Sequence, residues 1–221
     1  TIEASFDIYQ TGDLVFEDSI GFLSSNTLAV HCTTLTDTDI RLLKKNNVKI
    51  SHNPASNAYL GEGIAPVKRL LDSGITVGLA TDGSASNNNQ DLLAILKLTA
   101  QLQKLDALDP TAISSQKVLE MATIGGAKCL GLDHIIGSIE VGKKADIIIV
   151  DPWKPNSIAL HDPIANLVYS CTQENVQTVI VNGKIVMEDR VMTTVDEYTT
   201  LRDTQDCSDQ LLIRSGINKN D

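Results

Sequence analysis

The sequence lacks long apolar runs and an excess of positive charge. No apolar stretch approaches the roughly 20 residues of a membrane span, and residues 1–4 (TIEA) lack the basic and apolar regions of a signal peptide. Eighteen Lys and Arg stand against 28 Asp and Glu, a net charge of -10. Proteins that bind nucleic acids or anionic membranes use clustered Lys and Arg to do so. We therefore expect a cytoplasmic protein with a small-molecule partner, no nucleic acid and no membrane.

Cysteine is also scarce, and the four cysteines lie far apart with no C-x-x-C pair: Cys32, Cys129, Cys171 and Cys207. This spacing predicts reduced thiols rather than a disulfide framework. The chain has 221 residues, of which 42% are hydrophobic, enough for the core of one large domain or two small ones. It begins without Met, so we expect a processed chain or a piece of a longer one.

Several catalytic motifs are missing from the sequence. It contains no G-x-S-x-G nucleophile elbow and no complete G-x-x-x-x-G-K-[ST] phosphate loop, because Lys144 follows Gly142-Lys143 where that loop needs Ser or Thr. It has no H-x-H, H-x-x-E or H-E-x-x-H, and no H-x-E with P-C-x-x-C, so the usual sequence signatures of a complete zinc site are absent. From the residues alone, the chain looks like part of an active site.

The first part of the chain alternates between strand and helix patterns. Strands are predicted at 27–32, 48–54 and 75–83, and helices at 36–47, from Pro66 to Gly74, from Leu92 to about 100, and from about 115 to 130. Three strand and helix units in succession predict parallel strands with right-handed crossovers.

Near residue 131 the pattern changes to β structure. Residues 138–151 read as a turn and a strand, and 176–189 as two strands joined by Asn182-Gly183, a strong hairpin signal. Residues 161–171 suggest a short helix and strand, and residues 194–221 a helix and a frayed end. The expected division is therefore 1–130, an α/β part, and 131–221, a β-rich part with a carboxyl-terminal helix and tail.

Two predicted strands end in groups that can do chemistry, His31 and Asp82. Parallel strands present their carboxyl ends at one edge of the sheet, so the imidazole and the carboxylate could converge there. Each residue alone also has an ordinary explanation: a structural histidine, and an aspartate that forms a turn before Gly83. Their equivalent positions on two strands make a joint functional role about as probable as the structural explanation.

The other polar candidates have weaker claims. His52, close to Pro54, is expected to build a loop rather than to contact substrate. His134 and His161 lie in turn-like contexts past the boundary, and we expect neither at the site. Residues 87–89 (NNN) are expected to cap the following helix with their short side chains.

The motifs SHNPASN (51–57), TDGSASNN (81–88) and GKKADIIIVD (142–151) together resemble the amidohydrolase superfamily. The similarity is greatest to the methylthioadenosine/S-adenosylhomocysteine deaminases, in the branch that also holds triazine hydrolases and guanine deaminases. It continues through MATIGGAKCLGL (121–132) and so covers most of the chain.

The resemblance implies a fold and a metal site. Such proteins are (β/α)8 barrels with a small β-sandwich, and they bind one divalent metal, usually zinc. It implies that 1–130 is part of the barrel, about three βα units, and that 131–221 is part of the sandwich. His31 and Asp82 match the residues that end the sixth and eighth barrel strands, and Asp82 is the implied metal ligand. The other ligands would lie upstream of Thr1, since a complete barrel takes roughly 250 residues.

The resemblance also implies a reaction on a purine nucleoside. Metal-bound water with a pKa lowered to about 7 would attack the amino-bearing carbon of adenine and release ammonia. Asp82 would take the proton of that water, and His31 would stabilise the charge on its oxygen. A guanine or triazine hydrolase, an inactive half-barrel that serves in binding or assembly, and an unrelated doubly wound domain are alternatives. Exposed sheet edges predict a homo-oligomer or a partner chain that supplies the missing barrel half.

Overall fold

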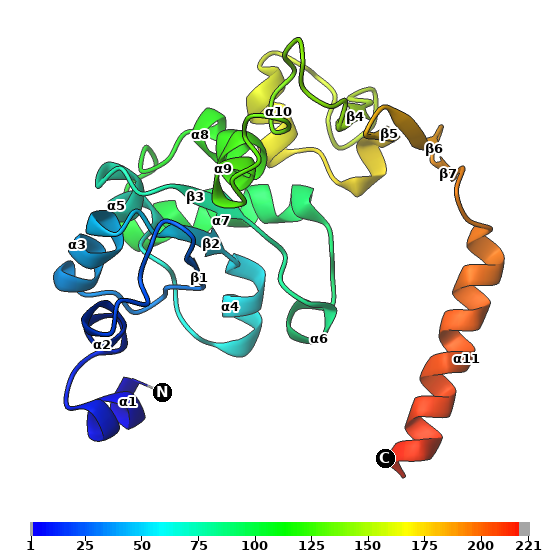
Figure 1. Ribbon diagram of the computed structural model, residues 1–221. Helices are drawn as coiled ribbons and strands as arrows, with labels where there is room; N and C mark the ends of the chain where they lie inside the picture. The colour runs from blue at the N-terminus through cyan, green and yellow to red at the C-terminus, as the bar shows by residue number, and fades with distance from the viewer. Residues whose placement is uncertain (1, 217–221) are drawn as a thin grey trace. The chain divides into compact units, whose positions relative to one another are not determined.

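A computed structural model describes residues 2–216 of the chain, with side chains from residue 6 (Figure 1). Its contacts divide the chain into two units. One runs to Lys143 and includes Pro152–Asn175, and the other comprises Lys144–Asp151 and the chain from Val176 onward. The predicted separation of a barrel part from a sandwich part near residue 131 stays a prediction. Among residues 2–216, no helix is both long and apolar enough to cross a bilayer.

The first unit is built on a parallel sheet of three strands in the order β1-β2-β3, which are Leu28–Val30, Lys49–His52 and Val77–Leu79. The three predicted strands and their parallel pairing are confirmed. The described part of this sheet does not close into a barrel. Its helical elements are α1 (Ile2–Tyr9), α2 (Asp13–Ser19), α3 (Asp37–Lys45), α4 (Pro54–Leu60), α5 (Val67–Asp72), α6 (Ser84–Asn87), α7 (Leu92–Ala107), α8 (Ser115–Glu120), the π-helical η1 (Met121–Gly125), α9 (Gly126–Cys129), α10 (Pro163–Tyr169) and the 3-10 turn η2 (Gln173–Asn175).

Local sequence explains where α3 begins and ends. The hydroxyl of Thr36 accepts a hydrogen bond from the Asp39 N–H, and the Asp39 carboxylate accepts one from the Thr36 N–H, which forms a capping box at the start of the helix predicted over 36–47. The helix ends at Asn46, followed by Asn47 in the left-handed region with a φ of 53°. Its buried face carries Ile40 and Leu43, which fix α3 in the core.

The core of the first unit contains fully buried aliphatic side chains from the central strand and its flanking helices, namely Leu43, Ile50, Leu70, Leu96 and Met121. Helix and sheet approach most closely at glycines. A Cβ on Gly78 would lie 2.9 Å from the Cα of Gly126, and one on Gly125 would lie 2.8 Å from the carbonyl oxygen of Val77. The helix predicted over 115–130 therefore passes β3 in its π-helical turn and the start of α9, where no side chain keeps the backbones apart.

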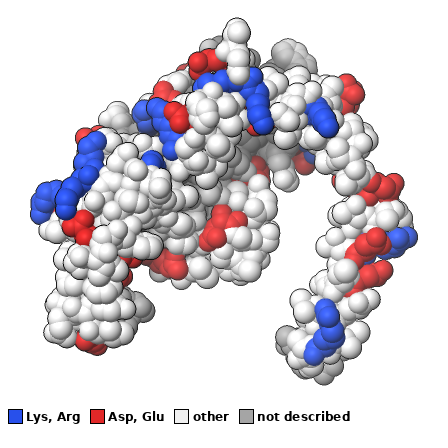
Figure 2. Space-filling model, in the orientation of Figure 1, with Lys and Arg blue, Asp and Glu red and all other residues white. Residues whose placement is uncertain are grey.

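The second unit is an antiparallel sheet in the order β4-β5-β6-β7, which are Ile147–Val150, Val176–Val181, Lys184–Glu188 and Val191–Met192. Asn182 and Gly183 form the predicted hairpin, with φ of 50° and 78° as a type I′ turn requires. Helix α11 (Glu197–Ser215) follows, and acidic and basic side chains are interspersed along it (Figure 2). The predicted frayed end at 217–221 lies outside the described residues.

Three expectations differ from the structure. Residues 161–171 form the helix α10 and no strand, since the N–H groups of Ser170 and Cys171 both donate to the carbonyl of Asn166 in the last turn of the helix. The asparagines at 87–89 do not cap α7; the carboxylate of Asp91 does, by accepting from the N–H groups of Leu93 and Ala94. Asp91 directly precedes α7, the position from which a side chain caps a helix. Helices α1, α2, α4 and α6 were not expected.

Candidate functional site

His31 and Asp82 follow the two outer strands of the parallel sheet. The N–H of His31 donates to the carbonyl of Ser51, which extends the pairing of β1 with β2 by one residue. The N–H of Ala80 donates in the same way to the carbonyl of His52, at the end of β3. Both side chains thus leave the sheet at the carboxyl ends of its strands, where α/β folds place reactive groups.

The backbone turns sharply at both residues. His31 has a φ of 66° and Asp82 a φ of 64°, left-handed values that are uncommon for residues other than glycine. Such conformations persist only where the surrounding structure holds them, and they concentrate at functional sites. Eight other described non-glycine residues also have a positive φ, so the turns at His31 and Asp82 are consistent with a shared role but do not establish one.

The two side chains meet. Nε2 of His31 lies 3.8 Å from Oδ2 of Asp82, and both side chains are about one-third exposed, at 34% and 29%. This separation is longer than a hydrogen bond, and it leaves both groups accessible to a ligand. The convergence predicted from the sequence is confirmed as geometry.

Helix α4 contributes two side chains next to the pair, Asn57 and Ser56, and Glu62 follows the helix. Oδ1 of Asn57 lies 2.7 Å from Nδ1 of His31, the ring nitrogen on the side away from Asp82, and the Glu62 carboxylate lies 3.8 Å from the same nitrogen. The buried hydroxyl of Ser56 lies beside Asp82 without a hydrogen bond of standard geometry. Sequence reasoning missed α4, although Pro54 at its first position is a common helix start.

The electrostatics keep Asp82 ionised. The Ser56 hydroxyl, then the Gly83 N–H and the Ser86 hydroxyl, hold the pKa of Asp82 below its ordinary value. The Gly83 N–H donates to Oδ1 at 2.7 Å, so Oδ2 remains directed toward His31. At neutral pH the group is a carboxylate that can accept a proton or bind a cation.

The loop after Asp82 is fixed by side chains of its own. The Asn87 amide donates to the carbonyls of Thr81 and Asn89, both at 2.7 Å, and the Gln90 amide donates to the carbonyl of Asp82 at 2.9 Å. The asparagines that we expected to cap a helix therefore hold the loop that carries the carboxylate.

The remaining histidines do not join the pair. His52 ends β2 with only 1% of its surface exposed, and neither ring nitrogen has a hydrogen-bond partner within the described residues. Burial lowers the pKa of His52 to about 4, so its ring is neutral at physiological pH. His134 and His161 are exposed. The expectation that His52 builds structure and does not contact substrate agrees with its burial.

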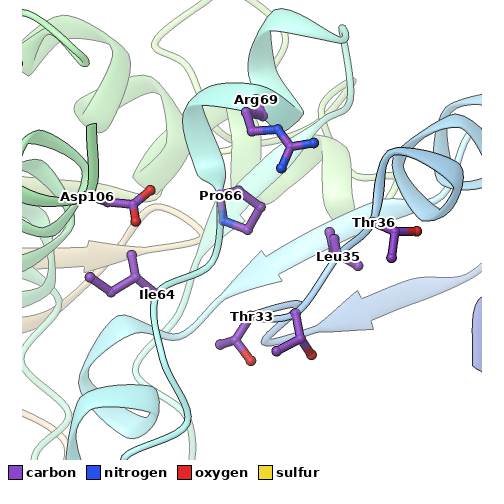
Figure 3. A pocket seen from close by; sticks show the side chains of 8 residues that line it. Thr33, Leu35, Thr36, Ile64, Pro66, Arg69 and Asp106 are labelled. Carbon is purple, nitrogen blue, oxygen red and sulfur yellow. The ribbon is translucent and has the colours of Figure 1, made fainter. Parts of the chain in front are cut away.

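A cavity of about 440 Å³ adjoins the loop that follows His31 (Figure 3). Figure 3 shows Asp106 and Ile64 on one wall and Leu35 and Thr36 opposite, with Arg69 directed between them. The guanidinium of Arg69 pairs with Asp37, and the carboxylate of Asp106 also lines the cavity. Neither His31 nor Asp82 lines it. The cavity is next to the candidate site without being part of it.

The site is incomplete as a metal centre. A catalytic zinc usually takes three protein ligands and keeps a position for water. Within residues 2–216, no group of three or more His, Cys, Asp or Glu side chains is placed to hold a metal ion. Asp82 and His31 supply at most two donors, so the described residues alone do not fit a catalytic zinc.

Comparison with known proteins agrees with the geometry. Residues 4–186 match the sequence model of the amidohydrolase family. The chain is 46% identical over 197 residues to a 5'-deoxyadenosine deaminase of Methanobrevibacter smithii, which covers 89% of this chain and 45% of that protein. It is 42% identical over 204 residues to a 5-methylthioadenosine/S-adenosylhomocysteine deaminase of Desulforudis audaxviator, which covers 92% of this chain and 47% of that protein.

Solved structures give the same result. The chain superposes on a zinc-bound adenosine deaminase of Xanthomonas campestris with a TM-score of 0.92 and 32% identity, over 95% of this chain and 48% of that one. An atrazine chlorohydrolase of Arthrobacter aurescens complexed with zinc gives a TM-score of 0.86 and 30% identity, over 92% and 45%. The chain thus spans about half the length of the relatives that it matches.

Proposed function

Because the chain belongs to the amidohydrolase family, we propose that it is part of a hydrolytic deaminase of adenine nucleosides of the methylthioadenosine or S-adenosylhomocysteine type. The observation that carries this proposal is the 3.8 Å approach of His31 Nε2 to Asp82 Oδ2 at the carboxyl edge of the sheet. The identities of 46% and 42% to two adenine-nucleoside deaminases support a nucleoside substrate.

In the proposed reaction a water oxygen adds to the amino-bearing carbon of adenine, and the amine leaves as ammonia. The Asp82 carboxylate takes a proton from the attacking water and passes it to the leaving amine, which its lowered pKa allows at neutral pH. His31 hydrogen-bonds the same oxygen through Nε2 and stabilises the charge that develops on it. We assign the catalytic role to these two residues.

Asp82 is also the proposed ligand of one divalent metal, which we expect to be zinc. Since the described residues do not complete a zinc site, the other ligands must come from elsewhere. The part of the relatives' length that this chain does not span is the expected source, either in the same polypeptide or in a partner chain.

The edges of the parallel sheet offer a surface for that missing part. Within the described residues, β1 and β3 each pair on one side only. Leu28 and Val30 of β1 are 37% and 45% exposed, unlike a strand inside a finished sheet. An open apolar edge pairs readily with another strand. We therefore propose that this surface binds the rest of the barrel, or a second copy of the chain when the rest is absent.

A fusion protein tests the proposed function. The residues of the M. smithii deaminase that precede the matched region are joined to this chain. Ammonia release is measured with methylthioadenosine, S-adenosylhomocysteine, 5'-deoxyadenosine and guanine, and chloride release with atrazine. We expect turnover of the adenine nucleosides. A folded fusion protein that releases ammonia from guanine alone, chloride from a chlorotriazine alone, or nothing at all would contradict the proposal; the last result favours a binding or assembly module.

A further inference from the structure

Asn57 is the residue that contacts His31 most closely. Its side-chain oxygen lies 2.7 Å from Nδ1 of His31, and 26 positions separate the two residues in the chain. Asn57 is only 1% exposed and lies within α4, which begins at Pro54. The contact is therefore made from a rigid, buried support, and the sequence motifs on either strand give no sign of it.

This contact decides which nitrogen of His31 carries a proton. A neutral imidazole has one N–H donor and one nitrogen that accepts, whereas an amide oxygen can only accept. An oxygen at 2.7 Å from Nδ1 requires the proton on Nδ1. Nε2 is then the nitrogen with a free lone pair, and it is the one that faces Asp82 at 3.8 Å.

We propose that Asn57 is a positioning residue that holds the proton of the neutral His31 ring on Nδ1, so that the lone pair of Nε2 is directed toward Asp82. The importance of this role depends on the function proposed above, because a catalytic His31 must offer Nε2 to the attacking water. In its neutral form Nε2 accepts a hydrogen bond from that water. Once protonated, it donates to the oxygen that bears the developing charge, while Asn57 keeps accepting from Nδ1.

Among the described residues, three polar side chains lie beside the ring nitrogens of His31, and one of them is within hydrogen-bond distance. The Glu62 carboxylate lies 3.8 Å from Nδ1 and the Asp82 carboxylate 3.8 Å from Nε2, while the Asn57 oxygen lies at 2.7 Å. The Asp82 charge alone would favour a proton on Nε2, which is the opposite arrangement. The shorter contact to Asn57 therefore opposes Asp82, and Glu62 acts in the same direction as Asn57 from farther away.

The amide of Asn57 has two possible orientations with opposite consequences. In the observed one, Oδ1 faces His31 and the buried Nδ2 has no hydrogen-bond partner within the described residues. The reverse orientation would place Nδ2 against Nδ1 as a donor and would require the proton on Nε2. The tautomer of His31 in solution distinguishes the two arrangements.

Long-range ¹H–¹⁵N correlation spectra of the ¹⁵N-labelled, metal-free chain test the proposal, since they identify the protonated ring nitrogen. The signals of His31 are assigned by their loss in His31→Ala and recorded at a pH where the ring is neutral. We expect His31 in the Nδ1–H form. A wild-type His31 in the Nε2–H form would overturn the proposal.

Variants of Asn57 and Glu62 separate positioning from a structural role. Asn57→Leu keeps the size of the side chain and removes the acceptor, so we expect the Nδ1–H form to lose its dominance. Asn57→Asp keeps an acceptor oxygen and should retain that form. Glu62→Gln is the matched control, because it changes the other group beside Nδ1 and should leave the tautomer unchanged. If Asn57→Leu does not fold, the wild-type spectrum together with those of Asn57→Asp and Glu62→Gln still tests the proposed tautomer of His31.

The outcome is independent of catalysis. An active fusion protein with His31 in the Nε2–H form would overturn the role of Asn57 and leave the proposed function in place. An inactive fusion protein with His31 in the Nδ1–H form would do the reverse.

Discussion

His31 and Asp82 approach within 3.8 Å although β1 and β3, the strands that carry them, do not pair with each other. Strand β2 lies between them, and both residues bring their side chains together by adopting left-handed backbone conformations. The approach is therefore a property of the folded sheet and not of local sequence. Each reactive group depends on a turn in the chain that costs free energy, on the order of 1 kcal/mol or more for a residue other than glycine.

Removal of either group should abolish most of the activity of the fusion protein. Asp82→Asn removes the proton acceptor, and we expect kcat to fall about 10²- to 10⁴-fold. His31→Ala removes the stabilising contact and should lower kcat about 10²- to 10³-fold. Initial rates of ammonia release measure both. Asp109→Asn is the control. Hydrogen bonds from Thr111 lower the pKa of Asp109 as well, but this aspartate lies in a turn that we place outside the site. Wild-type turnover in Asp82→Asn would refute the assignment.

Metal content should depend on the missing part of the barrel. We expect the 221-residue chain alone to hold far less than one zinc, because the described residues supply at most two donors. The fusion protein should hold about one zinc per chain, as a catalytic site with three or more protein ligands does. Elemental analysis of both, with Asp82→Ala in the fusion protein as the variant that loses zinc, measures this. Near one zinc in the chain alone would mean that ligands come from a symmetric partner or from another site.

The stability of the first unit should fall in mild acid because of His52. Burial lowers its pKa in the folded state to about 4, whereas the unfolded chain titrates near the ordinary value of 6.5. The contribution of neutral His52 to the free energy of unfolding is therefore complete above pH 6.5. It is lost progressively as the pH falls from 6.5 toward 4, because in this range the unfolded state takes up the proton and the folded state does not. Between pH 7 and pH 5 the loss amounts to about 2 kcal/mol.

Urea unfolding at pH 7 and pH 5 checks this prediction through the difference between variants. His52→Leu should remove most of the pH-dependent loss, since no imidazole remains to be protonated on unfolding. His134→Gln alters an exposed histidine and should keep the loss. Equal pH dependence in wild type and His52→Leu would show that other groups, such as carboxylates, cause it.

Gly78 should not tolerate a side chain. A Cβ there would lie 2.9 Å from the Cα of Gly126 and 3.1 Å from the Sγ of Cys129, so Gly78→Ala must push the helix away from β3. We expect a loss of about 1–3 kcal/mol in the free energy of unfolding, the usual cost of overpacking. Gly12→Ala is the matched control because its Cβ would have no atom within 4 Å. A Gly78→Ala protein as stable as Gly12→Ala would mean that η1 and α9 can shift freely.

The strands and longer helices could be predicted because each carries a local signal. The capping residue Thr36, the Asn182-Gly183 turn and the apolar spacing after Leu92 all act within a few residues, and the structure agrees with each. The convergence of His31 and Asp82 was also predictable, because parallel pairing alone brings the ends of strands to one edge.

The missed features depend on contacts between distant residues or on weak local signals. Nothing around Asn57 in the sequence indicates a hydrogen bond to His31, because the two residues are 26 positions apart and meet only in the folded chain. The asparagines after Ser86 could either cap a helix or hydrogen-bond within a loop. In the structure the Asp91 carboxylate accepts from the free N–H of Leu93, so the asparagines are not the cap. Helix α4 is only 7 residues long, so its single signal at Pro54 was too weak to distinguish it from a loop.

The position of β2 makes it the spacer of the reactive pair. Adjacent strands lie about 4.8 Å apart, so the backbones that carry His31 and Asp82 are separated by roughly twice that distance. The twist between β2 and its two neighbouring strands then contributes to the distance that the side chains of His31 and Asp82 must span to approach each other. Substitutions at Ser51 or His52, which pair with residues of the outer strands, would therefore alter the distance between the two reactive groups without touching either of them.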